Sequence, residues 1–212
     1  MRVVVGSGCS RDFRQAELDR HLQAMSRLVE HARNESGLSP CFTMILRSAA
    51  SAPAKALISM KDELLSAGVN AKAILAQLEP EEDLRQFFAS LSELAPVEPA
   101  KELIRWARNP RLLDAHEQVT FGEVMCWSGD AMRRDADKRN ALTLFDEDAP
   151  DTARLGQLAF AALWTASALV PERRLTPRAA ARPCGAYQQA QDTPVAVSPR
   201  RPSLQGWPLV RH

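Results

Sequence analysis

The chain has 212 residues, of which 45% are hydrophobic and 25% charged, and its formal net charge at pH 7 is +1. These values are typical of one soluble globular domain with a substantial core. No apolar run approaches the length of a membrane span, and the apolar run at the start is too short for a signal peptide. The four cysteines are scattered without a CxxC pair, which favours reduced thiols over disulfides or a zinc site. We therefore expect a cytoplasmic protein without a metal or cofactor.

The charge is unevenly distributed along the chain. From Arg173 to the C-terminus there are seven arginines, no lysine and one acidic residue, a net charge of +6, while the other 172 residues carry 20 basic and 25 acidic groups, a net charge of −5. A body with this charge lacks the basic face that phosphate neutralisation requires, although clustered arginines can still form a local one. Nucleic-acid binding is therefore left open.

The first half of the chain alternates between strand-like and helix-like patterns. Uninterrupted apolar runs predict buried strands, whereas apolar residues spaced alternately three and four apart predict amphipathic helices. Gly37 and Gly68 are placed to end two of the helices. The predicted order is a short strand at 3–5, a helix at 12–34, a strand at 41–46, a helix at 51–68, a strand at 71–78, a helix from 80 to about 94, and a short helix or turn at 102–108.

A β-hairpin is predicted near the middle of the chain. The polar residues His116, Gln118 and Thr120 alternate with residues of the opposite face along the first strand. A glycine–glutamate pair at 122–123 predicts a tight turn before a second strand at 124–127. The other face of the first strand contains the apolar residues Ala115, Val119 and Phe121.

The hairpin also concentrates the chemistry of the chain. It is expected to bring His116, Gln118, Ser128 and Asp130 close together, with Glu123 at the turn. The group contains an imidazole, a carboxamide, a hydroxyl and two carboxylates. No other stretch of the sequence gathers such a set.

After the hairpin, a densely charged segment at 131–140 precedes a predicted strand at 141–145 and a helix from 150 to about 169. From residue 171 onward the pattern changes, because half of the chain's 14 prolines lie in 171–212, with no apolar periodicity. This composition predicts a disordered tail. Its functional alternative is an arginine-rich arm for an acidic partner.

The alternation of elements predicts an α/β layered fold with a mainly parallel sheet flanked by helices. We divide the chain into an N-terminal strand and helix extension at 1–38, an α/β domain at 39–170, and the Pro- and Arg-rich tail at 171–212.

The spacing of the hairpin residues resembles the signature of the phospholipase D superfamily, which is His-x-Lys, four residues, Asp, and then Gly-Ser-x-Asn. His116 and Ser128 stand at the His and Ser positions. Gln118 replaces the Lys, Glu123 replaces the Asp at the correct spacing, and Asp130 replaces the Asn after a shorter gap than usual. The resemblance covers roughly residues 41–169. Domains of this superfamily have a layered α/β fold in which the strand that carries the His is central in the sheet.

The resemblance implies a phosphodiesterase that works through a covalent phosphohistidine. His116 would be the nucleophile, Glu123 would support a histidine, and Ser128 would contact phosphoryl oxygens. Catalysis in the family uses a second histidine as the general acid. A chain with one motif therefore implies a two-fold homodimer that pairs two copies of His116.

The departures from the signature concern substrate binding. Phosphodiester cleavage depends on stabilising negative charge on the phosphoryl oxygens. Gln118 donates a hydrogen bond but carries no charge, and Asp130 adds an anion where an anion must bind. Arg133 and Arg134 are candidates to supply positive charge, and the alternative is that they belong to a solvated loop.

Three interpretations follow from these residues. The first is a phospholipase D-like phosphodiesterase with impaired activity toward a phospholipid or nucleic acid. The second is a non-catalytic binding or regulatory module that keeps the fold, which the changes at Gln118 and Asp130 favour. The third is an unrelated α/β protein whose hairpin matches by chance.

Overall fold

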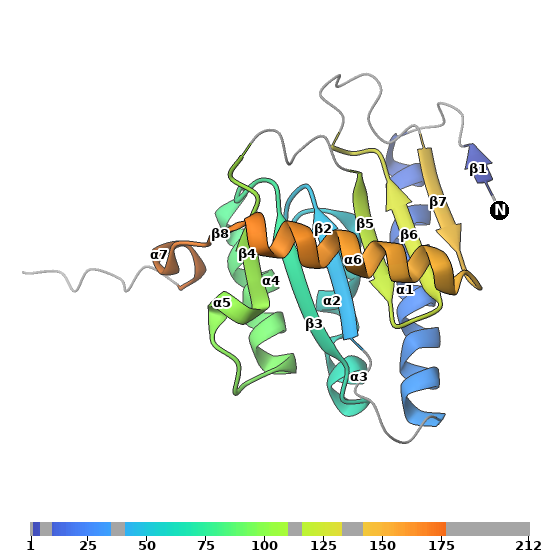
Figure 1. The fold of residues 1–212 in the computed structure, drawn as a ribbon, viewed down its shortest axis with the longest axis horizontal. Helices are drawn as coiled ribbons and strands as arrows, with labels where there is room; N and C mark the ends of the chain where they lie inside the picture. Colours follow the sequence, from blue (N-terminus) through green and yellow to red (C-terminus); the bar gives the residue numbers. More distant parts are fainter. Residues whose placement is uncertain (1, 5–9, 35–40, 110–115, 133–141, 177–212) are drawn as a thin grey trace, which may run out of the picture. The chain divides into compact units, whose positions relative to one another are not determined.

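The computed structural model describes residues 2–4, 10–34, 41–109, 116–132 and 142–176. Within these ranges, eight strands form one sheet in the order β1-β7-β6-β5-β2-β3-β4-β8 (Figure 1). The strands are β1 (Arg2–Val4), β2 (Cys41–Leu46), β3 (Asn70–Leu75), β4 (Ile104–Trp106), β5 (Glu117–Phe121), β6 (Met125–Gly129), β7 (Leu142–Asp146) and β8 (Ala168–Leu169).

The sheet is mixed, and most of its strand pairs are antiparallel. β2–β3 and β3–β4 run parallel, whereas β1–β7, β6–β7, β5–β6, β2–β5 and β4–β8 run antiparallel. The predicted α/β class is confirmed, but the prediction of a mainly parallel sheet is wrong. The three-residue turn between β5 and β6 explains part of this, because a parallel pair needs a crossover of a dozen or more residues.

Helices cover both faces of the sheet (Figure 1). α1, α2 and α4 pack on one face, where they contact β5, β2 and β3 respectively, and α6 crosses β5, β6, β2 and β3 on the other. The helices are α1 (Ser10–Asn34), α2 (Ala52–Ser59), α3 (Lys61–Ser66), α4 (Glu81–Leu94), α5 (Ala100–Leu103), α6 (Pro150–Ala166) and α7 (Glu172–Leu175).

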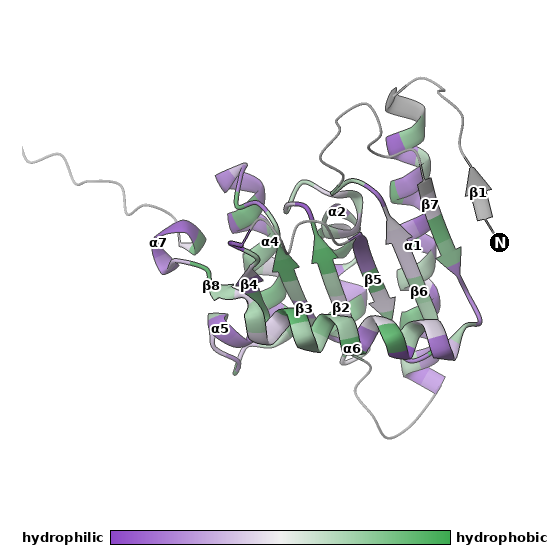
Figure 2. Cartoon of the chain, turned by 45° about the horizontal axis from the view of Figure 1, so that its top comes forward, coloured by the Kyte–Doolittle hydropathy of each residue, from purple (hydrophilic) through white to green (hydrophobic). Residues whose placement is uncertain are grey.

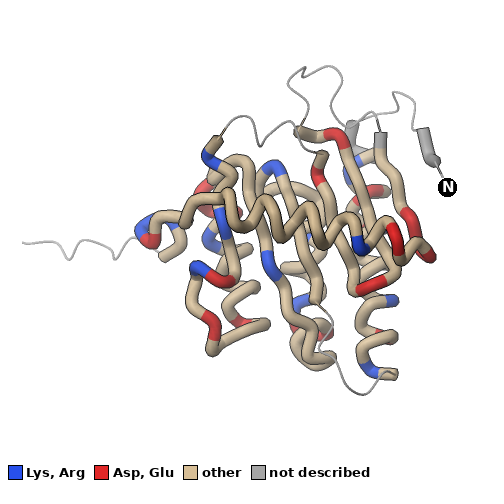
Figure 3. The backbone as a smooth tube through the Cα atoms, viewed as in Figure 1, with Lys and Arg blue, Asp and Glu red and all other residues tan. Residues whose placement is uncertain are grey.

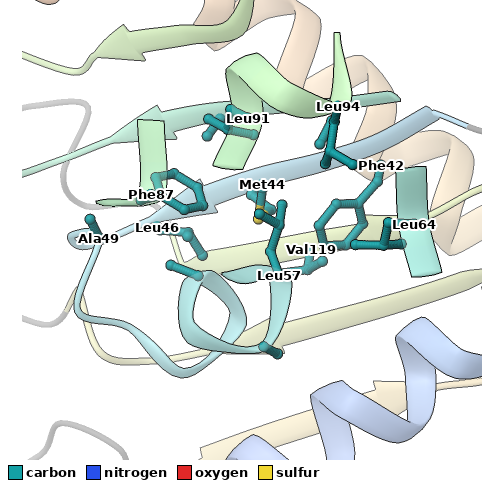
Figure 4. Close-up of a cluster of buried hydrophobic side chains, with 14 of the residues drawn as sticks. Phe42, Met44, Leu46, Ala49, Leu57, Leu64, Phe87, Leu91, Leu94 and Val119 are labelled. Carbon is teal, nitrogen blue, oxygen red and sulfur yellow. The ribbon is translucent and has the colours of Figure 1, made fainter. Parts of the chain in front are cut away.

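Alternate residues of the central strands supply the two apolar layers. Phe42, Met44 and Leu46 of β2 point toward buried side chains of α2 and α4 (Figure 4). Ile45, between them in sequence, packs with Phe160 of α6 on the opposite face. The central strands are therefore hydrophobic on both faces, as Figure 2 shows for β2 and β3.

Two predicted elements differ from the structure. The helix predicted at 51–68 is broken at Met60, where the backbone leaves helical geometry and separates α2 from α3. The helix or turn predicted at 102–108 contains strand β4 instead, because Ile104 is buried and pairs with Ala73 of β3. A three-residue strand has too few alternating positions to be recognised from its pattern.

The compact unit that contains the sheet runs from Met1 to Arg178. It includes α7, whose Leu175 is buried and which packs against α4. The predicted disorder of the C-terminal tail concerns residues that, from 177 onward, lie outside the described ranges. No helix in the described part of the chain is long and apolar enough to cross a membrane.

Candidate functional site

The predicted hairpin is present, and its register is fully defined. β5 and β6 pair Glu117 with Gly129 and Gln118 with Ser128. Gly122 begins the turn with φ of +64°, a left-handed conformation that glycine adopts without strain. The structure thus confirms that Gln118 and Ser128 lie directly opposite one another.

The remaining predicted site residues are spread along the hairpin. His116 is exposed and immediately precedes β5, whereas Glu123 is exposed in the turn at the other end of that strand. At about 3.4 Å per residue, a five-residue strand holds these two residues well over 10 Å apart along the chain. Glu123 therefore does not meet His116 within one chain. Arg133 and Arg134 lie outside the described residues.

Helix α6 closes over Gln118. The backbone of Gly156 approaches so closely that a Cβ atom there would lie 2.6 Å from Gln118 Nε2 and 2.8 Å from Thr120 Oγ1. The Gln118 amide donates a weak hydrogen bond to the Cys126 sulfur at 3.5 Å. Gln118 therefore belongs to the packing between α6 and the hairpin.

The opposite face of the hairpin carries a buried carboxyl group. Glu117 is 3% exposed, and its Oε1 accepts hydrogen bonds from the Arg47 backbone N–H and the Ser51 hydroxyl, each at 2.7 Å. These bonds tie the start of β5 to the loop that leads from β2 into α2. Burial raises the pKa of Glu117, while the two hydrogen bonds act in the opposite direction.

A second carboxyl group faces Glu117 from helix α1. Burial, followed by the negative charge of Glu117, raises the pKa of Glu17 to about 7, while Arg20 acts in the opposite direction. The buried Asp130, directly after β6, adds a further negative charge near both groups. Glu17 therefore takes up a proton at a higher pH than an ordinary glutamate does.

Glu17 and Glu117 border a pocket of about 420 Å³ between α1 and the start of α2, which we call the α1–α2 pocket. Three cations from three segments line it: Arg14 on α1, Arg47 at the end of β2, and Lys55 on α2. Arg47 Nη1 also donates to the Ala131 carbonyl at 3.3 Å. The other lining residues are Gln15, Glu17, Leu18, Ser48, Ala50, Ser51, Ala52, Glu117 and Ala131.

The charges in the pocket favour an anion. Three cationic side chains, Arg14, Arg47 and Lys55, line the pocket with two carboxyl groups, Glu17 and Glu117. Among the described residues, His, Cys, Asp and Glu side chains are not grouped in a way that could hold a metal ion. The pocket can therefore bind a negatively charged group through ion pairs with its cations and through a hydrogen bond from the protonated form of Glu17.

Neither the pocket nor its two glutamates were singled out from the sequence. One signal was present: position 117 falls on the face of β5 that otherwise carries Val119 and Phe121, and an acid on an apolar face requires partners. Those partners, Arg47 and Ser51, lie 70 and 66 residues away in the chain. Pattern analysis within one strand does not identify them.

A further titratable group, on α1, lies in the core. His21 is fully buried, and its ring lies 4.6 Å from Trp127 and 5.2 Å from Phe145, measured between ring centroids. Neither of its nitrogens has a hydrogen-bond partner among the described residues. Burial lowers the pKa of His21 to about 3, so the imidazole is neutral at physiological pH and acts as an apolar core group.

Comparisons with known proteins identify no family. No protein-family model matches the sequence, and no curated protein matches it. Among solved structures, the chain is similar to TrmBL2, an archaeal chromatin protein described as showing a novel mode of DNA binding, with 12% identity and a TM-score of 0.44. The match covers 72% of this chain and 52% of that chain, so this chain spans about half its length. A likeness at this level carries no argument about fold family or function.

Proposed function

We propose that the chain is a non-catalytic binding module with a phospholipase D-like fold, and that the α1–α2 pocket binds a small anionic ligand. The observation that carries the proposal is the pocket itself, which Arg14, Arg47 and Lys55 line together with Glu17 and Glu117, two carboxyl groups of raised pKa. The layered fold and the hairpin support the phospholipase D-like part of the proposal.

The absence of catalysis is supported by the position of Gln118. In the phospholipase D superfamily, the lysine at this position would supply positive charge to the phosphoryl oxygens. Loss of one preorganised donor typically slows such a reaction by about a hundred- to a thousandfold. Here the side chain is uncharged and its amide lies against Gly156 of α6.

Binding and protonation are expected to be coupled. The charged groups around Glu17 are Arg14 and Arg20 on α1, Arg47 directly after β2, Lys55 on α2, and the acids Glu117 and Asp130. Protonation of Glu17 removes one negative charge from the wall of the pocket. At an effective dielectric between that of protein and water, this change is worth about three- to tenfold in the affinity for an anion.

A titration with sodium sulfate tests the proposal, because sulfate keeps the same charge between pH 6 and 8. Backbone amide shifts are recorded by NMR, with sodium chloride of equal ionic strength as the control. Sulfate should shift amides of residues 47–55, with about three- to tenfold tighter binding at pH 6 than at pH 8, and this pH dependence should disappear in Glu17→Gln. Equal shifts with chloride would refute an anion site.

The second candidate function is a phosphodiesterase that uses His116. It is favoured by the register of the hairpin, which sets Ser128 opposite Gln118 with His116 at the exposed start of the same strand. This function requires a homodimer in which two copies of His116 share one site. Hydrolysis of bis(p-nitrophenyl) phosphate or single-stranded DNA that is lost in His116→Ala would support it and would contradict a purely non-catalytic role.

A further inference from the structure

The outward side of helix α6 is unusually apolar. Leu155 and Leu158 are 67% and 60% exposed, although leucine is among the residues most often buried. Exposed alanines continue the row toward the end of the helix at spacings of three and four residues, which place them on one side. We call this set the α6 stripe: Leu155, Leu158, Ala159, Ala162 and Ala166.

The stripe is not needed to hold α6 on the sheet. A different row of the helix does that, in which Ala153, Gly156 and Phe160 are buried. In the described part of the chain, α6 crosses its face of the sheet with β5, β6, β2 and β3 beneath it (Figure 1). A continuous exposed apolar row on a helix in this position is typical of an interaction surface.

The charges around α6 are arranged so that two copies would complement each other. Asp148 and Asp151 are exposed where the helix begins. Trp164 lies near the end of α6, and Lys72 and Arg105 lie over its ring, at 5.7 Å and 5.1 Å from the ring centroid. Figure 3 shows acidic residues gathered where α6 begins and basic residues on the strands beneath its other half.

We propose that two copies of the chain pair through the α6 stripe, with the two helices antiparallel about a two-fold axis. Antiparallel pairing brings the acidic start of each α6 toward Lys72 and Arg105 of the other copy, which lie on β3 and β4 near the end of α6, whereas parallel pairing would bring acid against acid. It is also a closed, isologous contact, the commonest arrangement for a dimer.

The side-chain sizes along the stripe favour the same orientation. An antiparallel pair centred between residues 160 and 161 sets Leu155 against Ala166 of the second copy, and Ala159 against Ala162 of the second copy. Each leucine end of the stripe then meets an alanine end, so the helices can approach closely. Because a stable interface buries on the order of 1,600 Å² in total, strand residues beside α6 would also contribute, and the half-buried Ser128 of β6 lies on this face.

Sedimentation velocity of the full chain tests the proposal. The wild type should sediment with twice the 23.4 kDa mass of the chain at micromolar concentration. Replacing both Leu155 and Leu158 by Ser should give a monomer with an unchanged far-UV circular dichroism spectrum. A matched control replaces Leu65 and Val97, exposed apolar residues far from α6 in sequence, and this variant should stay dimeric.

A charge exchange tests the orientation. Asp151→Lys and Lys72→Glu should each weaken the dimer by about tenfold, and combining them in one chain should restore most of its affinity. The proposal is overturned if the wild type is still monomeric at about 100 micromolar, or if the stripe variant dimerises like the control. Failure of the charge exchange to restore a dimer would overturn the antiparallel arrangement. None of these results depends on the ligand of the α1–α2 pocket.

Discussion

The Glu17 carboxyl group links the pocket to a measurable pH dependence of stability. Its pKa is about 7 in the folded chain, against 4.5 for an ordinary glutamate. Because the folded-state pKa is raised, its contribution to stability is fully present below pH 4.5 and is lost as the pH rises through 7. Since one pKa unit corresponds to about 1.4 kcal/mol, this shift corresponds to a loss of about 3 kcal/mol in the free energy of unfolding between pH 4.5 and pH 8.

Replacing Glu17 by Gln should therefore stabilise the protein at pH 8 and change little at pH 5. Gln is neutral and nearly isosteric with the protonated acid. Because the Glu17 side chain is only partly buried, solvent screening lowers the expected gain at pH 8 to about 1–3 kcal/mol. Urea unfolding of both proteins at pH 5 and pH 8 measures the difference.

The comparison has two internal controls. His21 titrates in both proteins and cancels from the difference between them. Asp19→Asn removes an exposed carboxyl group of the same helix, which accepts a hydrogen bond from Gln15 at 2.9 Å, and it should not reproduce the pH-dependent gain. If Glu17→Gln changed the free energy of unfolding equally at both pH values, the reasoning about the buried proton would be refuted.

Three further predictions concern buried polar groups. The pKa of His21 is lowered to about 3, so its contribution to stability is full above pH 6.5 and is lost as the pH falls. The free energy of unfolding lost between pH 7 and pH 5 should therefore be about 2 kcal/mol smaller in His21→Phe than in the wild type. An equal loss in both proteins would contradict a neutral buried histidine. Thr143→Val leaves the Trp127 indole N–H without the hydroxyl that accepts its hydrogen bond at 2.6 Å, so urea unfolding should show a cost of about 1–3 kcal/mol, and an unchanged midpoint would mean that this bond is not maintained in solution. Glu117→Ala should lower the free energy of unfolding by about 2–4 kcal/mol, because the Arg47 N–H and the Ser51 hydroxyl lose their acceptor. Glu117→Gln keeps an acceptor oxygen and should recover most of that loss at pH 7. A Gln variant as unstable as the Ala variant would show that the charge of Glu117, and not its hydrogen bonds, stabilises the fold.

Much of the fold follows from local sequence pattern. The apolar run at 41–46 and the period of 3.6 residues in 81–94 predict β2 and α4 because each element buries a large apolar face of its own. The hairpin is predicted as well, since strand alternation and the turn glycine agree. These elements depend little on distant residues.

The strand order and the pocket depend on contacts that pattern does not encode. β5 pairs antiparallel with β2 on one side and with β6 on the other, and β2 and β6 lie far apart in the chain. The pocket requires α1 to lie beside the loop between β2 and α2, so that Glu17 meets Glu117. The motif directs attention to His116, just before β5, and to Gln118 within it, whereas the buried Glu117 lies between them and points to the other face.

The most direct test of the anion site compares two lysine variants in the sulfate titration at pH 6. Lys55→Gln removes a cation that lines the α1–α2 pocket, and Lys101→Gln removes an exposed lysine of α5 outside its lining. The proposal predicts about three- to tenfold weaker sulfate binding in Lys55→Gln and unchanged binding in Lys101→Gln. Equal sulfate affinity in both variants and the wild type would contradict an anion site in the α1–α2 pocket.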